Sequence, residues 1–179
     1  MEYPEFVTAL AKPLPTSHER VDHALLGLIG ELGEFADAWK KSLIYKQEFD
    51  RINAIEELGD LSFYAQMLQN EGLCLDASRT AEEIYTMNGL IFRLSTSIGA
   101  FTHAHMEDDP DRFQESQFDF DGLFSDINDK LEDLIYGINM TVEEVQRLNM
   151  EKLTKRYPDK VYTDAHAAER LDKIEEGKV

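Results

Sequence analysis

Residues 27–39 read GLIGELGEFADAW, and residues 52–64 read INAIEELGDLSFY. Each stretch carries two acidic residues three positions apart, which on a helix places both carboxylates on one face. The four acids are Glu31, Glu34, Glu57 and Asp60. The two pairs are symmetric about Tyr45–Lys46, so two antiparallel helices that meet there would bring the pairs to the same height. The sequence therefore predicts a helical hairpin with four carboxylates that face one another.

Four carboxylates in apolar surroundings repel one another unless a cation joins them, so we expect a metal site. Neither acidic pair includes the histidine at i+3 that is typical of di-iron bundles. Ligation by oxygen alone favours Mg²⁺, with Mn²⁺ as the alternative. Because Mg²⁺ often shares its coordination with substrate phosphates, we expect an enzyme that acts on phosphoryl groups. The alternative for these acids is an ordinary solvated helix surface.

Composition narrows the class of protein. The chain has 179 residues, 42% hydrophobic residues and a net charge of −18, which fits a folded protein and disfavours binding to nucleic acid or an anionic membrane. We expect no membrane span and no signal peptide, because the sequence has neither a long apolar run nor a basic start. The single cysteine, Cys74, is consistent with a reducing, cytoplasmic location.

The pattern along the chain predicts an all-α fold. Helical periodicity favours one domain over residues 1–160, built as a bundle of two antiparallel helix hairpins with short flanking helices, and then a charged tail at 161–179. The expected helices span 2–11, 16–44, 50–70, 80–106, 121–137 and 141–156. Capping boxes are expected at Thr16–Glu19, Thr80–Glu83 and Thr141–Glu144. We expect the two hairpins to pack together with the acidic site between them.

The second hairpin resembles a degenerate copy of the first. The residues at 27–32 and 89–94 share Gly-Leu-Ile-x-x-Leu, and in this alignment Arg93 replaces Glu31 and Lys130 replaces Glu57. Chance similarity between amphipathic helices is the alternative. If the repeat is real, Arg93 and Lys130 would face the metal site across the bundle and contact phosphate.

The two acidic motifs, Glu-x-x-Glu and then Glu-x-x-Asp, resemble those of the MazG-like all-alpha nucleotide pyrophosphohydrolases. The stretch 149–158, NMEKLTKRYP, is similar to the C-terminal motif of that family. Together the matches cover about a quarter of the chain. This chain departs from the shortest family members because a second helix pair separates the two matches. That pair would complete a bundle that a second subunit completes in short relatives, and a homodimer is the alternative.

The resemblance implies a reaction, namely hydrolysis of a nucleoside triphosphate between the α and β phosphates to monophosphate and pyrophosphate. It implies metal ligation by the four acids and phosphate contact by Lys152 and Arg156. It also implies a polar substrate contact for Asn149. For the two cations the alternative is a helix C-terminus that favours positive charge. Two further readings stay open: a hydrolase specific for dUTP or dCTP, and a non-catalytic module that binds a nucleotide or a protein.

Further side chains are candidates for the same site. Glu57 belongs to the metal-binding set and is a candidate catalytic residue, whereas Glu56 would either orient the attacking water or be a surface acid. Tyr64 lies one turn beyond Asp60, and Trp39 lies five residues after Glu34, so each would stack on a base or pack in the core. His18 and His23 lie upstream of the first motif, where either would touch substrate or, as we expect, lie at the surface. His103 and His105 point to different helix faces, so we do not expect them to bind one metal ion together.

Overall fold

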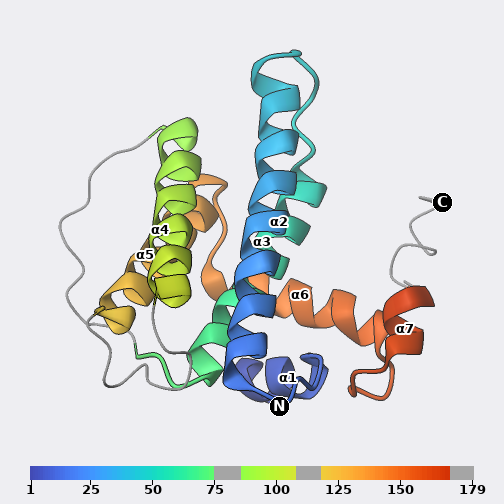
Figure 1. The fold of residues 1–179 in the computed structure, drawn as a ribbon. Coiled ribbons are helices and arrows are strands. Elements are labelled where there is room, and N and C mark those ends of the chain that lie inside the picture. The colour runs from blue at the N-terminus through green and yellow to red at the C-terminus, as the bar shows by residue number, and fades with distance from the viewer. Residues whose placement is uncertain (75–85, 108–117, 170–179) are drawn as a thin grey trace.

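The computed structural model describes residues 1–74, 86–107 and 118–169 (Figure 1). These residues form helices and contain no strand, which confirms the all-α prediction. The helices are α1 (Tyr3–Leu10), α2 (Ser17–Leu43), α3 (Arg51–Asn70), α4 (Met87–Glu107), α5 (Phe120–Gly137), α6 (Val142–Arg156) and α7 (Asp164–Glu169). No helix within the described ranges is both long enough and apolar enough to cross a membrane.

The long hairpin of α2 and α3 is the centre of the molecule. Its first helix begins with the predicted capping box, in which Thr16 accepts from the backbone N–H of Glu19 and the Glu19 side chain bonds back. The second begins at Asp50, whose carboxylate accepts from the backbone N–H of Asn53. Between them Lys46 adopts a left-handed backbone conformation (φ 57°), so the chain reverses where the symmetry of the acidic pairs predicted.

The second hairpin, α4 and α5, packs against one side of the first, with α4 on α2 and α5 on α3 (Figure 1). Its first helix begins later than predicted. Residue 86 is not helical, and the Thr86 hydroxyl accepts from the backbone N–H of Gly89 at 3.3 Å, so Thr86 caps α4 at its start. The capping box predicted at Thr80–Glu83 lies outside the described residues.

The opposite side of α3 is covered by α6 and α1 (Figure 1). Helix α6 starts with the third predicted capping box, Thr141 with Glu144. Beyond it, the chain returns to the N-terminal helix: the backbone N–H of Tyr162 donates to the carbonyl of Ala9 at 3.2 Å. A small apolar cluster joins α1 to α6, namely Phe6, Leu10, Leu153 and Tyr157, with Tyr162 and Ala167 packed against it. The sequence did not predict α7.

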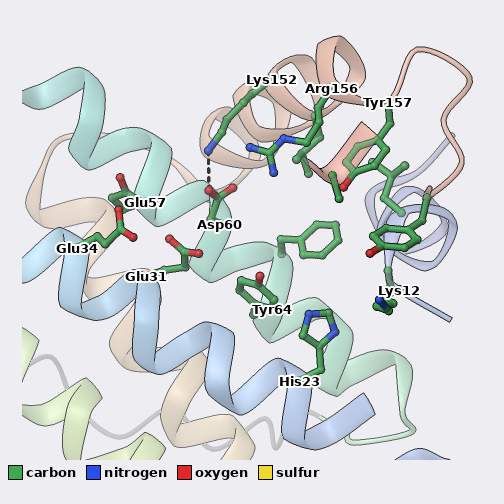
Figure 2. Close-up of a pocket in the computed structure, with 16 residues that line it drawn as sticks. Lys12, His23, Glu31, Glu34, Glu57, Asp60, Tyr64, Lys152, Arg156 and Tyr157 are labelled. Atoms are coloured by element: carbon green, nitrogen blue, oxygen red, sulfur yellow. Dashed lines mark hydrogen bonds and ion pairs between the residues drawn. The ribbon is translucent and has the colours of Figure 1, made fainter. Parts of the chain in front are cut away.

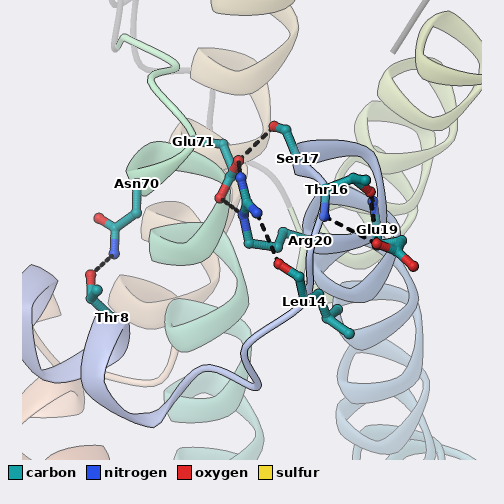
Figure 3. Close-up of polar contacts among 8 residues, drawn as sticks. All are labelled: Thr8, Leu14, Thr16, Ser17, Glu19, Arg20, Asn70 and Glu71. Atoms are coloured by element: carbon teal, nitrogen blue, oxygen red, sulfur yellow. Dashed lines mark hydrogen bonds and ion pairs between the residues drawn. The ribbon is translucent and has the colours of Figure 1, made fainter. Parts of the chain in front are cut away.

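A polar network fixes the start of α2 to the end of α3 (Figure 3). The Arg20 guanidinium donates to both carboxylate oxygens of Glu71, at 2.6 and 2.9 Å, and to the carbonyl of Leu14 at 3.0 Å. Ser17 donates to the same carboxylate at 2.6 Å. A two-pronged arginine–carboxylate pair restricts orientation as well as distance, so this network sets the alignment of the two helices that carry the acids.

Candidate active site

Three of the four predicted acids come together midway along the α2–α3 hairpin (Figure 2). Oxygen atoms of Glu31, Glu57 and Asp60 all lie within 4.8 Å of one another. Glu34 is exposed and lines the same cavity, but it lies outside this tight group. The i,i+3 spacing on two antiparallel helices thus produces the convergence that the sequence predicted, with three members close and one at the edge.

Burial and mutual repulsion disfavour ionisation of Glu31 and Glu57. Burial raises the pKa of Glu31 to about 8, with further contributions from the charge of Asp60 and from hydrogen bonding to Glu57. Glu57 is only 4% exposed, and burial raises its pKa as well, although the bond to Glu31 acts in the opposite direction. A divalent cation would remove this repulsion, so the three carboxylates fit Mg²⁺ or Mn²⁺ by their chemistry.

Asp60 is held differently, because α6 provides its partners. Lys152 donates to one carboxylate oxygen at 2.5 Å and Asn149 donates to the other at 2.8 Å. The buried Asn149 in turn accepts from the Tyr3 hydroxyl at 3.2 Å. Gly59 makes this approach feasible, since a Cβ there would lie 3.0 Å from the Cβ of Asn149. The N-terminal helix, α6 and the acidic hairpin are thereby joined at one point.

A cavity of about 430 Å³ extends from the acids toward α1 and α7. Lys152 and Arg156 lie beside the acids, and the far end combines aromatic and apolar side chains with Lys12 and His23 (Figure 2). Its lining there includes Leu10, Phe63, Tyr64, Leu153, Tyr157 and Tyr162. The order of side chains is therefore acidic, basic and then aromatic, which matches the order of metal, phosphate and base in a bound nucleotide.

Tyr64 and His23 form part of the cavity wall next to α2. Tyr64 is half-buried, and burial together with the charge of Glu31 raises its pKa to about 12, so the phenol stays protonated. The rings of His23 and Tyr64 meet edge to face, with centroids 5.7 Å apart. His23 was expected at the surface, yet it is half-buried and lines the cavity, where burial and the charge of Lys12 lower its pKa.

Several residues of the cavity were not predicted as site residues. They are Leu10, Ala11, Lys12, Phe63, Leu153, Tyr157, Tyr162 and Ala167. Tyr157 lies within the C-terminal motif and could have been inferred from it. The residues of α1 and α7 have no comparable signal, because they reach the cavity only through the docking of α1 on α3 and α6 and of α7 on α6.

Five predicted residues do not line the cavity. One is Asn149, which is buried and donates to Asp60 but is not part of the cavity wall, so its predicted contact with substrate is not supported by position. The Trp39 indole N–H donates to Asn88 at 2.7 Å, and its ring packs on Phe49. Glu56 lines a separate groove on the other flank of α6, together with Lys152 and Lys155. Its predicted role as the general base is therefore not supported by position.

Arg93 and Lys130 also lie elsewhere. They line a pocket between α4 and α5, where Lys130 pairs with Asp126 at 3.2 Å. The expectation that they face the acids across the bundle is wrong for this chain. The acidic cavity opens toward α6 and α1 rather than toward α4 and α5, so it does not lie between the two hairpins as predicted.

The chain matches no protein-family model, no curated protein and no solved structure. What the cavity binds must therefore be inferred from its own side chains.

Proposed function

We propose that this protein is a Mg²⁺-dependent hydrolase that cleaves nucleoside triphosphates between the α and β phosphates, releasing monophosphate and pyrophosphate. The observation that supports this proposal is the order of side chains along one cavity: three clustered carboxylates, then Lys152 and Arg156, then an aromatic end. The choice of bond rests on the resemblance of the acidic motifs and of residues 149–158 to the MazG-like pyrophosphohydrolases. A cavity of about 430 Å³ has the size of a small-molecule site.

Each part of the cavity has a role in the proposed reaction. Glu31, Glu57 and Asp60 would hold Mg²⁺, which neutralises phosphate charge and activates water. Lys152 and Arg156 would contact the phosphates, and arginine offers paired planar donors for this purpose. Without substrate, Lys152 pairs with Asp60, so the lysine must exchange a carboxylate partner for phosphate when the nucleotide binds. Tyr64 and Tyr157 would stack on the base.

In the proposed step, the oxygen of a water molecule bonds to the α phosphorus. The bond between that phosphorus and the oxygen that bridges it to the β phosphorus breaks. The electron pair of that bond leaves with pyrophosphate, and the proton of the water passes to a carboxylate. Glu57 is our candidate acceptor, because it belongs to the group of carboxylates that would hold the ion next to the attacking water.

The test is turnover of a panel of ribo- and deoxyribonucleoside triphosphates with Mg²⁺, with the products separated by chromatography. We expect monophosphate and pyrophosphate, loss of turnover in Glu57→Gln, and at least a tenfold lower kcat/KM in Lys152→Met. Lys155→Met is the matched control, since Lys155 lies on the same helix but lines the other groove, and it should be close to wild type. The panel also names the preferred base.

Three results would each contradict part or all of the proposal. Diphosphate and phosphate as products would retain a metal-dependent hydrolase but reject the α–β bond. A folded protein that binds Mg²⁺ and nucleotide without turnover would favour a non-catalytic binding module. Lys152→Met and Lys155→Met with equal kinetics would reject the assignment of the phosphates to this cavity.

A further inference from the structure

A second group of metal-binding side chains lies apart from the cavity, where α2 begins and α4 ends. It consists of His18 and Asp22 on α2 and His105 on α4, and one ligand atom from each lies within 4.8 Å of the others. The Nε2 atom of His105 is 3.0 Å from one oxygen of Asp22, and the Nε2 atom of His18 is 3.5 Å from the other. None of these residues lines the acidic cavity.

The spacing of these atoms is close to that of a tetrahedral metal site. With bonds of about 2.0–2.1 Å, the donor atoms around Zn²⁺ lie roughly 3.3 Å apart. The two nitrogen–oxygen distances, each to a different oxygen of Asp22, lie just below and just above that value. The i,i+4 spacing of His18 and Asp22 places both side chains on one face of α2, and that face is directed at His105. Because one ligand atom of each residue lies within 4.8 Å of the other two, the three side chains are close enough to converge on one ion.

The exposure of the three residues suits a site that a metal can enter. The side chain of His105 is 2% exposed, whereas those of His18 and Asp22 are 40% and 49% exposed. The buried histidine provides a fixed ligand, and the two partly exposed residues leave access from solvent. Two imidazoles with one carboxylate suit Zn²⁺ and other transition metals, whereas Mg²⁺ prefers oxygen ligands alone.

We propose that His18, Asp22 and His105 form a Zn²⁺ site that joins α2 to α4, with a fourth position open to water. The site is independent of the proposed nucleotide cavity and differs from it in metal preference. It would link the two hairpins near the ends of their helices, so a bound ion would stabilise the folded chain against unfolding. Metal binding requires neutral imidazole, so the affinity of this site for Zn²⁺ should weaken as pH falls.

The test uses the full chain after removal of metals with a chelator. Zn²⁺ titration by calorimetry should give one site per chain that Mg²⁺ does not compete for, together with a rise in Tm. Co²⁺ should give the intense visible absorption of a four-coordinate ion. Two ligand variants, His18→Gln and Asp22→Asn, should weaken Zn²⁺ binding by more than about tenfold, since even the loss of an outer hydrogen-bonding partner often costs 10–100-fold.

Because the chain has a net charge of −18, two control variants are needed to separate Zn²⁺ binding at this site from binding to other side chains. His103→Gln removes an exposed histidine from α4 two residues before His105, and Glu57→Gln disrupts the acidic cavity. Both should retain the Zn²⁺ site. If His18→Gln and Asp22→Asn bind Zn²⁺ like wild type, or if only Glu57→Gln loses binding, the proposal is overturned. The ligand variants alter partly exposed residues, so their folding can be checked by Tm without metal.

Discussion

The ring of Tyr64 lies directly on the backbone of Gly27. A Cβ placed on Gly27 would be 2.4 Å from two carbon atoms of that ring, closer than any real contact. The absence of a side chain at residue 27 is thus what allows Tyr64 to lie between α2 and the cavity.

We predict that Gly27→Ala destabilises the protein by about 1–3 kcal/mol, because the ring must move or α2 must shift. Gly30→Ala is the matched control in the same helix, since a Cβ there meets nothing within 4 Å. It should stabilise the protein by about 0.5–1 kcal/mol through helix propensity. Urea unfolding measures both effects. Equal stability of the two variants would show that the position of the Tyr64 ring does not depend on the absence of a side chain at residue 27.

Asn149 links Tyr3 to Asp60, and we predict that this link is cooperative. Asn149→Leu removes a buried acceptor and a buried donor at once, so it should cost about 1–3 kcal/mol for the groups left without a partner. Tyr3→Phe should cost about 0.5–1.5 kcal/mol in the wild type but close to nothing when Asn149 is already replaced. A double-mutant cycle by urea unfolding gives the coupling, and additive effects would contradict the link.

The raised pKa of Glu31 predicts how the metal-free protein responds to pH. The folded-state pKa is about 8 and the ordinary value is 4.5, so between these values the folded chain binds more protons than the unfolded chain. The free energy of unfolding should therefore fall as pH rises from about 5 to 8.

Unfolding in chelator at several pH values measures this fall. Glu31→Gln should show a weaker dependence on pH over the same range. Adding Mg²⁺ to the wild type should restore stability most at the high end, where the carboxylates are ionised. If the free energy of unfolding depends on pH to the same extent in the wild type and in Glu31→Gln, the prediction is wrong.

Glu71 predicts a response of opposite sign at lower pH. Burial raises the pKa of Glu71, but hydrogen bonds from Arg20 and Ser17 outweigh burial and leave the pKa below its ordinary value. The stabilisation by this carboxylate is complete above that ordinary value and is lost as pH falls through the lower folded-state pKa. Glu71→Gln should therefore be less stable than wild type at pH 7, and the difference should shrink below about pH 4. A difference that is constant with pH would reject this account.

The parts of the fold that depend on short sequence separation could be predicted from the sequence. The spacing of the acids, two capping boxes and the reversal near Tyr45–Lys46 each depend on residues close in the chain. These signals sufficed to place Glu31, Glu57 and Asp60 together.

The sequence could not predict which helices pack on which side of α3, because α3 is central and is buried on several sides. It contacts α1, α2, α5 and α6, so its apolar pattern does not single out one face. From the sequence we therefore expect the α4–α5 hairpin on the side of α3 that carries the acids. In the structure α6 occupies that side. The same error misplaced Arg93 and Lys130. The prediction that His23 lies at the surface was also wrong, since the cavity that it lines forms only when α1 and α6 pack on α3.

The ion pair between Lys152 and Asp60 spans 92 positions of sequence, whereas the acids lie within one hairpin. Contacts between near neighbours form faster than contacts between distant segments, because less chain entropy is lost in closing the loop. During synthesis both acidic motifs therefore emerge before Lys152 and Arg156 have been made. If the proposed site holds a divalent ion, the nascent chain would present the ligands of that ion before it contains either of the two cations that we propose for the phosphates.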